Sequence, residues 1–280
     1  KMNDVSKLHD KTSTTILTAA MVLVAMLYLF PLVWFILSSF KPGSELFSYP
    51  LSVLPEHATM QNYLDAWSSL DFVRYFTNTL KSSVITTILT VIASATCGFA
   101  FAKYDMKWLK FFFVCIIATT MLPTEVIMNP VFTVIRELGL YDSLAGIIIP
   151  SINTATGIFM FRTFFVSIPD DLIESARIDG ASDGEIFMKI MLPIAKPIIM
   201  TLSIFSFQWR WNDYIWPLIV LNDPKKYTFQ VAIRSLVGAE NVNWTVLIAA
   251  SVLSIIPLVL VFIVFQRYIL DSGATTGMKD

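Results

Sequence analysis

The residues best suited to chemistry gather in one short apolar stretch, residues 208–216. In chain order they are Gln208, Trp209, Arg210, Trp211, Asn212, Asp213 and Trp216. A charge at the centre of a membrane helix costs about 2.5–3.5 kcal/mol on insertion scales. Arg210 and Asp213 are three residues apart, so they can pair on one helix face and offset that cost. Planar amides and aromatic faces also suit the binding of sugars. Two interpretations stay open: a network that fixes helix packing, or part of a polar path for a sugar.

One further acid stands alone in an apolar stretch. Glu125 lies between Pro123 and Pro130, where it either bonds backbone groups freed by the prolines or faces a cavity. His9 and His57 lie outside the apolar runs without ligand-spaced partners, and Cys97 and Cys115 lie within such runs. The phosphate-loop pattern G-x-x-x-x-G-K-[ST] does not occur. We therefore expect no catalytic, metal or cofactor site in this chain.

The composition indicates that these residues sit in a membrane protein. Of the 280 residues, 55% are hydrophobic and 15% charged, against about 25% charged in soluble domains. The net charge of −1 gives no reason to expect a nucleic-acid partner. Apolar runs of about 20 residues are long enough to cross a bilayer as helices. The sequence predicts one all-α membrane domain, 1–280, with six spans: about 15–38, 78–102, 111–135, 143–166, 197–221 and 245–268.

Lysine and arginine near the ends of these spans predict their orientation. The denser set is Lys1, Lys7, Lys11, Lys103, Lys107, Lys110, Arg177, Lys189, Lys196, Arg267 and Lys279. Positive charge is enriched on the cytoplasmic side, so both termini should be cytoplasmic. The outer loops would then be 39–77 and 222–244. Within the first, residues 62–76 are apolar at helical spacing, which fits either an interfacial amphipathic helix or a segment packed on the outer helix ends.

The loop between the fourth and fifth spans, residues 169–196, contains signals for two short helices. Asp170 and Asp171 place negative charge at a helix N-terminus. Gly180 can adopt the left-handed conformation that ends a helix. Ser182 and Glu185 form a capping-box pattern for the next helix. A structured helix pair between membrane spans indicates a docking surface.

The spacing within this loop resembles the signature of ABC importer permeases. The family pattern reads E-A-A, three residues, G, nine residues, I, one residue, L-P. Here it is matched by Glu174-Ser175-Ala176, Gly180 and Ile190-Met191-Leu192-Pro193, with Ser175 in place of the usual alanine. In that family the loop is a coupling helix that sits in a cleft of the ATPase subunit. The resemblance implies that the ATPase-coupling residues here are Glu174, Ser175, Ala176, Asp179, Gly180, Ile190, Leu192 and Pro193.

A second resemblance indicates the substrate class. The stretch from Trp211 to Leu218 is similar to the W-N-x-[FY]-x-x-P-L motif of carbohydrate-type permeases, and the C-terminal Gln266-Arg267-Tyr268 with Gly273, Gly277 and Lys279 is similar to the end of that subgroup. Residues 121–126 and 142–146 resemble maltodextrin-type and glycerol-3-phosphate-type permeases. The resemblance implies a substrate pathway lined by residues among Gln208, Trp209, Trp211, Asn212, Asp213, Trp216 and Glu125.

The family resemblance also implies partners and a location. The expected partners are a second homologous permease, two ATP-binding cassette subunits that use ATP and Mg, an extracytoplasmic sugar-binding protein, and the lipid bilayer. The expected location is the bacterial plasma (inner) membrane. A polyol or glycerol phosphate importer is the alternative. A membrane-embedded transferase would need acidic pairs or His clusters, and a secondary transporter would usually show more spans and repeated broken helices.

Overall fold

The computed structural model describes the backbone of residues 2–237 and 242–274 and the side chains of residues 14–237 and 242–266. Those residues form helices and connecting loops, without a strand. The chain divides into two compact units, Lys1–Leu70 with Leu236–Ser254, and Asp71–Ser235 with Ile255–Asp280. Lys1, Gly277 and Lys279, which contributed to the sequence-based predictions, lie outside the described residues.

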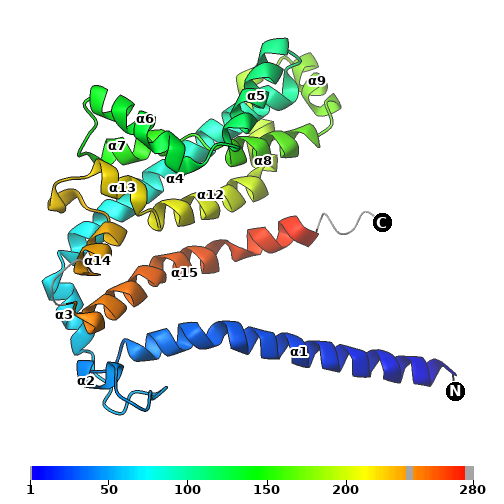
Figure 1. Cartoon of the computed structure of the whole chain (residues 1–280). Coiled ribbons are helices and arrows are strands. Elements are labelled where there is room, and N and C mark those ends of the chain that lie inside the picture. Colours follow the sequence, from blue (N-terminus) through cyan, green and yellow to red (C-terminus); the bar gives the residue numbers. More distant parts are fainter. Residues whose placement is uncertain (1, 238–241, 275–280) are drawn as a thin grey trace. The chain divides into compact units, whose positions relative to one another are not determined.

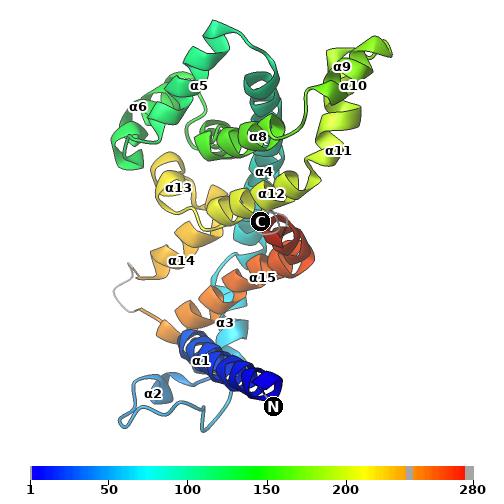
Figure 2. The ribbon, with the colours of Figure 1, turned by 90° about the vertical axis from the view of Figure 1, so that its right-hand side faces the viewer.

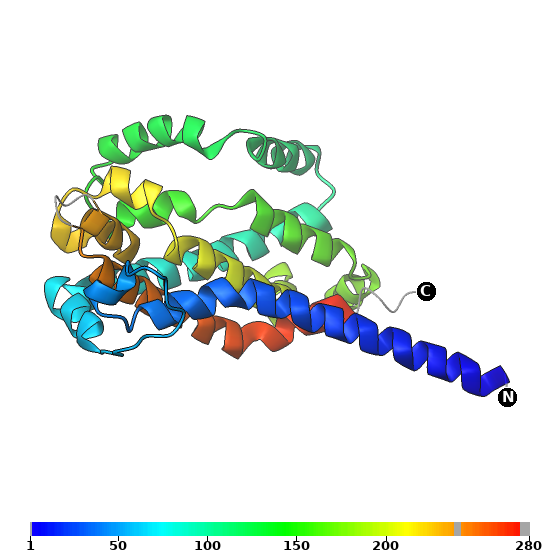
Figure 3. The same cartoon turned by 60° about the horizontal axis from the view of Figure 1, so that its bottom comes forward.

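The first unit begins with a single long helix, α1 (Met2–Ser38), which Figure 3 shows without a break. Its residues Thr14–Ser38 are long and apolar enough to span a membrane. Next come the short α2 (Gly43–Leu46) and α3 (Gln61–Ser69). The Lys41 side chain is buried and donates to the carbonyl oxygen of Ser52. The Asn62 side-chain amide donates to the carbonyl oxygens of Ser39 and Lys41, at 2.8 Å each, which ties α3 to the end of α1.

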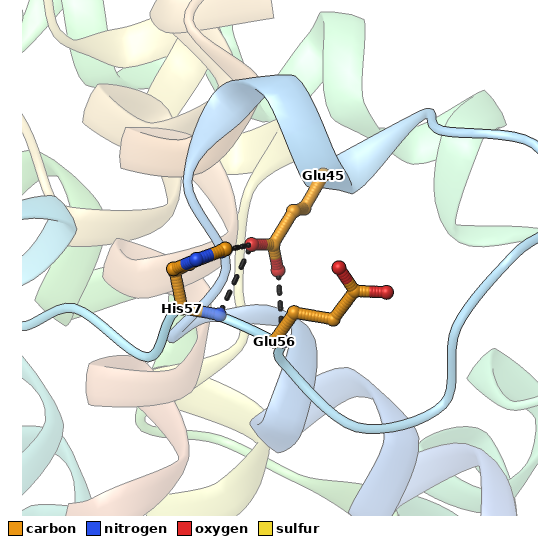
Figure 4. A group of neighbouring side chains, drawn as sticks. All are labelled: Glu45, Glu56 and His57. Carbon is orange, nitrogen blue, oxygen red and sulfur yellow. Dashed lines mark hydrogen bonds and ion pairs between the residues drawn. The ribbon is translucent and has the colours of Figure 1, made fainter.

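The side chains of Glu45, Glu56 and His57 lie close together in this unit (Figure 4). Their proximity is explained by contacts that close a loop. The Glu45 carboxylate accepts the backbone N–H groups of Glu56 and His57, each at 3.0 Å, and contacts Nδ1 of His57 at 2.7 Å. No dashed line in Figure 4 reaches the Glu56 carboxylate. Glu45 therefore acts as an anchor that closes the loop between α2 and α3.

The second unit is built on α4 (Phe72–Lys103), which packs along α8 (Ala155–Val166) and α12 (Lys196–Trp211). Figures 1 and 2 show these three helices side by side. The face of α4 in this contact consists of small residues at spacings of three and four: Thr79, Ser83, Thr86, Thr90, Ser94 and Gly98, all buried. Small residues let membrane helices approach closely. A Cβ on Gly98 would lie only 2.5 Å from the Cβ of Phe161 on α8.

Two of the expected spans are not continuous helices. Residues 111–135 fall in α5 (Lys107–Thr119) and α6 (Thr124–Glu137), whose axes turn by 111° at the break. Pro123 directly precedes α6, and proline both lacks an N–H donor and disfavours helix in the residue before it. The expected span 197–221 contains α12, which ends at Trp211, and α13 (Ile215–Val220) after a three-residue break.

The remaining spans are found near their expected positions. Residues 144–166 hold α7 (Leu144–Ile148), the one-turn η1 (Ile149–Ser151) and α8. The last helix, α15 (Trp244–Ala274), follows η3 (Pro224–Lys226) and α14 (Phe229–Val237). Four helices in the described residues can each span a membrane. Up to six spans form if each of two bent pairs counts as one: Lys107–Thr119 with Thr124–Glu137, and Asp183–Ile194 with Lys196–Trp211. The outer segment expected at 62–76 is split, because α3 ends at Ser69 and α4 begins at Phe72.

Candidate functional site

A cavity of about 480 Å³ lies in the second unit, between the end of α12, the start of α13, α6 and the region where η1 meets α8. Its polar wall comes from α12, from the break after it and from the turn before α8. Its apolar wall comes from α6 and from two tryptophans. The lining residues are Thr124, Ile127, Met128, Val131, Pro150, Ser151, Asn153, Thr154, Gln208, Trp209, Arg210, Asn212, Asp213 and Trp216.

The two charged residues of the cavity wall bond to each other. The Arg210 guanidinium lies 3.2 Å from Oδ2 of Asp213, and the predicted i, i+3 pairing is confirmed. Arg210 also donates to the Ser151 hydroxyl at 2.6 Å, which joins the end of α12 to η1. Both charged side chains keep a little more than a fifth of their surface exposed. The pair thus faces the cavity and adds no net charge to it.

Two of the tryptophans in the cluster have different environments. Trp216 is mostly buried, and its indole N–H donates to the carbonyl oxygen of Gly146 at 3.2 Å, which fastens α13 to α7. Trp209 is 38% exposed, and its ring stacks on Phe205 one helical turn earlier. Trp209 is therefore the aromatic side chain of the cavity wall that offers most free surface.

The structure brings together five of the seven residues proposed for a pathway: Gln208, Trp209, Asn212, Asp213 and Trp216. Trp211 is fully buried, with its ring stacked on Phe207 and edge-on to Phe76, so its position is one of helix packing. Glu125 lies exposed in the first turn of α6, outside the lining of the cavity.

Four polar lining residues were missed as pathway candidates: Thr124, Ser151, Asn153 and Thr154. Such weakly polar residues in membrane spans usually form helix–helix contacts. Thr154 does cap α8, since its hydroxyl accepts the Gly157 N–H at 3.1 Å. In the sequence, Ser151, Asn153 and Thr154 follow Pro150 and interrupt an otherwise apolar span, which could have marked them as pathway candidates.

A polar clamp, defined by Asp142 and Lys226, holds the loops that precede α7 and follow α13. The Asp142 carboxylate accepts from Lys226 Nζ at 2.7 Å and from the backbone N–H groups of Asn222 and Asp223. These hydrogen bonds, that from Lys226 foremost, lower the pKa of Asp142 to about 2. The clamp therefore stays ionised at neutral pH and ties the end of α13, whose Trp216 lines the cavity, to the start of α7.

The loop between α8 and α12, here called the docking segment (residues 170–195), has the local structure that the sequence predicted. It contains α9 (Asp171–Ile178), α10 (Asp183–Ile186), the π-helical turn η2 (Phe187–Met191) and α11 (Leu192–Ile194). Gly180 has φ +86°, the left-handed conformation expected of it. The capping box between Ser182 and Glu185 is present in both directions.

The charged groups of the docking segment are tied down locally. Glu185 accepts from Lys189 at 2.8 Å and from the backbone and hydroxyl of Ser182, and these bonds, Lys189 first, lower its pKa to about 2. Asp183 accepts from Tyr104 and Arg177, which lowers the pKa of its carboxyl. The segment is thus held in shape by its own ion pairs and caps.

The docking segment has an inner and an outer face. Ile173, Ile186 and Met191 are buried and pack with Phe99 and Phe165 of α4 and α8. Among the residues proposed for coupling, Glu174, Ser175, Asp179, Gly180 and Pro193 are exposed, whereas Ala176, Ile190 and Leu192 are partly buried. Ile178 is 86% exposed and Met188 62% exposed, which is unusual for such large apolar side chains.

Comparison with known proteins agrees with these features. Residues 94–272 match the family described as "Binding-protein-dependent transport system inner membrane component". The chain is 35% identical over 264 residues to the arabinooligosaccharides transport system permease protein of Bacillus subtilis (strain 168), covering 93% of this chain and 94% of the relative. It is 32% identical over 257 residues to the sn-glycerol-3-phosphate transport system permease protein of Brucella abortus (strain 2308), covering 89% and 91%.

A solved structure shares the fold as well. It is described as a bacterial ABC transporter involved in the import of the acidic polysaccharide alginate, and it superposes with a TM-score of 0.83 at 27% identity, covering 92% of this chain and 97% of the other. The relatives and the solved structure match nearly the whole chain, and the family match covers residues 94–272. The chain therefore belongs to the binding-protein-dependent transport system inner membrane components, and it is a multi-pass, non-catalytic permease subunit of an ABC importer.

Proposed function

We propose that this permease forms half of the pathway for a neutral sugar, and that the cavity at the end of α12 is part of that pathway. The observation that carries the proposal is the makeup of the cavity wall. Asn153, Gln208 and Asn212 offer amide donors and acceptors, and Trp209 offers an aromatic face. Sugars are recognised by such hydrogen-bonding groups together with aromatic rings that cover their C–H surfaces.

The charge balance of the cavity favours a neutral sugar over a glycerol phosphate. Among the described residues that line it, Arg210 and Asp213 are the charged ones, and they pair with each other. Binding a phosphate or carboxylate usually requires a cation with free donors. Here the Asp213 carboxylate bonds Nη1 of Arg210 and cancels the net charge of the guanidinium. The relative named for arabinooligosaccharides fits the same choice. The relative named for sn-glycerol-3-phosphate and the alginate importer are named for anionic substrates, so the proposal rests on the cavity itself.

The docking segment is proposed to receive the ATPase subunit. Its outer face combines the acidic Glu174 and Asp179 with the exposed apolar side chains of Ile178 and Met188. An apolar patch rimmed by charge is typical of a protein interface. ATP and Mg would bind to the ATPase subunits, and Glu174, Ser175, Ala176, Gly180, Ile190, Leu192 and Pro193 would form or shape the contact.

The full arrangement follows from this assignment. Six spans in the bacterial inner membrane, with the bent α5–α6 pair counted as one, would leave the docking segment and both termini in the cytoplasm. Loops 39–77 and 222–244 would then face the sugar-binding protein on the outer side. A second, homologous permease would supply the other half of the pathway.

Substitution of the cavity residues tests the sugar pathway. Asn212→Ala and Asp213→Asn are expected to change the transport rate or the choice among sugars, while the amount of assembled complex stays near that of the wild type. Asp213→Asn frees the Arg210 charge, so inhibition by anionic sugars should increase. Glu125→Gln, outside the cavity, is the matched control. If the cavity variants assemble poorly, or transport normally with unchanged selectivity, the cluster serves helix packing instead.

A further inference from the structure

Contacts at the end of α4 join the docking segment to the helix that organises the second unit. Lys103 is the last residue of α4, and its side chain is only 4% exposed. Its Nζ donates to the carbonyl oxygen of Ile168 and to Oδ1 of Asp170, both at 2.6 Å. A buried lysine that bonds a carbonyl just beyond the end of α8 completes that helix end. One side chain thus connects α4, α8 and the start of the docking segment.

A second contact reaches the middle of the segment. The Tyr104 hydroxyl donates to Oδ2 of Asp183 at 2.7 Å, and Arg177 donates to Oδ1 of the same carboxylate at 3.0 and 3.3 Å. Asp183 is the first residue of α10, and Arg177 lies in the last turn of α9. The Asp183 carboxylate therefore holds both docking helices to the residue that follows α4.

Aromatic packing reinforces the same junction. Phe99, one turn before the end of α4, has its ring centroid 5.2 Å from that of Phe187, 5.9 Å from that of Tyr104 and 6.0 Å from that of Phe165. Phe187 belongs to the docking segment and Phe165 to α8. Contacts of this kind stabilise a junction beyond simple burial of the rings. The junction between α4, α8 and the docking segment is therefore held by hydrogen bonds and by aromatic packing.

We propose that Tyr104 and Asp183, supported by Lys103, form a latch that passes movement of the docking segment to α4. This inference rests on the proposed role of the segment as the ATPase contact. The Asp183 carboxylate and the Arg177 guanidinium are each about half exposed, whereas Tyr104 is partly buried and the Lys103 side chain is almost fully buried. α4 is packed directly on α12, whose end lines the cavity, and the close approach at Gly98 leaves little room for α4 to slip along α8. Tyr104, Asp183 and Lys103 are positioning residues, because they touch neither sugar nor nucleotide.

Two substitutions remove the latch and leave the exposed Ile178 and Met188 unchanged. Tyr104→Phe deletes one hydroxyl and keeps the ring against Phe99, and Asp183→Ala removes the acceptor of both Tyr104 and Arg177. Removing a hydrogen bond to a charged acceptor changes an equilibrium constant by about tenfold. We expect each variant to bind the ATPase as the wild type does and to lose about tenfold in sugar-stimulated ATP hydrolysis and in uptake.

The measurement uses the whole importer in proteoliposomes, with ATPase retention, ATP hydrolysis and uptake recorded on the same preparation. Lys110→Met, which breaks the exposed ion pair of Lys110 with Asp105 near the same end of α4, is the matched control and should change nothing. The Tyr104→Phe/Asp183→Ala double variant should be no worse than Asp183→Ala alone. Coupled uptake within about twofold of wild type in Tyr104→Phe overturns the latch. Loss of ATPase binding in that variant also overturns it, since the residue would then belong to the contact surface. Failure of wild-type permease to bind the ATPase through this segment overturns the docking proposal and the latch together.

Discussion

Replacing Gly98 by alanine is expected to force α4 and α8 apart. The added Cβ would lie 2.5 Å from the Cβ of Phe161 and 2.9 Å from the backbone nitrogen of Arg162. Non-bonded carbon atoms in good contact are about 3.5–4.0 Å apart, so the two helices must separate by roughly 1 Å at this point. Because a backbone atom of α8 is among those met, rotation of a side chain cannot relieve the overlap.

The size of the effect follows from the overlap. Overpacking of a tight contact destabilises a protein by about 1–3 kcal/mol. A change of 1 kcal/mol shifts the melting temperature of a chain of this size class by about 2–4 °C. The melting temperature of purified Gly98→Ala permease in detergent, followed by tryptophan fluorescence, should therefore fall by about 2–12 °C. Sugar uptake should fall with it, since α4 also carries the contact with α12.

A second glycine supplies the control. A Cβ on Gly184 would meet nothing within 4 Å, and this residue lies in α10 without a positive φ. Alanine is the better helix former, so Gly184→Ala should leave the melting temperature unchanged or slightly higher. An unchanged melting temperature in Gly98→Ala would refute the inference that α4 and α8 are in contact at van der Waals distance there.

Three further results are expected. Trp211→Ala should lower the yield of folded complex, because removing a fully buried ring costs about 3–5 kcal/mol. Trp209→Ala should instead change the apparent affinity for sugar at normal yield. The reverse pattern in yield and uptake assays would contradict the roles given to the two tryptophans. Glu185 has a folded pKa of about 2 against an ordinary 4.5, so its ionised form stabilises the docking segment fully above pH 4.5, and this contribution is lost as pH falls towards 2. The difference in amide-exchange protection of α10 between wild type and Glu185→Gln should be constant from pH 7 to 5 and shrink below 4.5; a difference that shrinks already between pH 7 and 5 contradicts the assignment. A reporter fused after Asp280 should be active in the cytoplasm, and activity only outside it would contradict the proposed topology.

Local features of the fold could be predicted from the sequence because their causes are local. The uncharged runs of α1 and α15 are long enough to span a bilayer wherever they pack. Gly180 and the Ser182–Glu185 box depend on residues within one turn, and the structure confirms both. The Arg210–Asp213 pair also joins residues only three apart, although Asp213 lies just beyond the end of α12.

Features that depend on distant partners could not be predicted in the same way. Trp209 and Trp211 are two residues apart in one motif, yet Trp211 is buried against partners such as Phe76 and Phe207, and Phe76 is distant in the sequence. Tyr104 and Asp183 are separated by 79 residues, so no spacing rule connects them. The end of α12 at Trp211 and the 111° turn between α5 and α6 show that polar groups and prolines break spans that hydropathy alone would leave intact.

The central claim is that this permease moves a neutral sugar by a movement received from an ATPase at the docking segment. The most direct test is uptake of a labelled neutral oligosaccharide into proteoliposomes that contain the complete importer and its sugar-binding protein, with wild-type permease or Gly180→Asp. An aspartate at Gly180 must adopt φ +86°, at a cost of about 1 kcal/mol or more. We predict ATP-dependent uptake by the wild type, and a Gly180→Asp permease that inserts in the membrane but retains less ATPase and transports no sugar. Uptake that is independent of ATP, or full uptake with normal ATPase recovery in Gly180→Asp, would contradict the account.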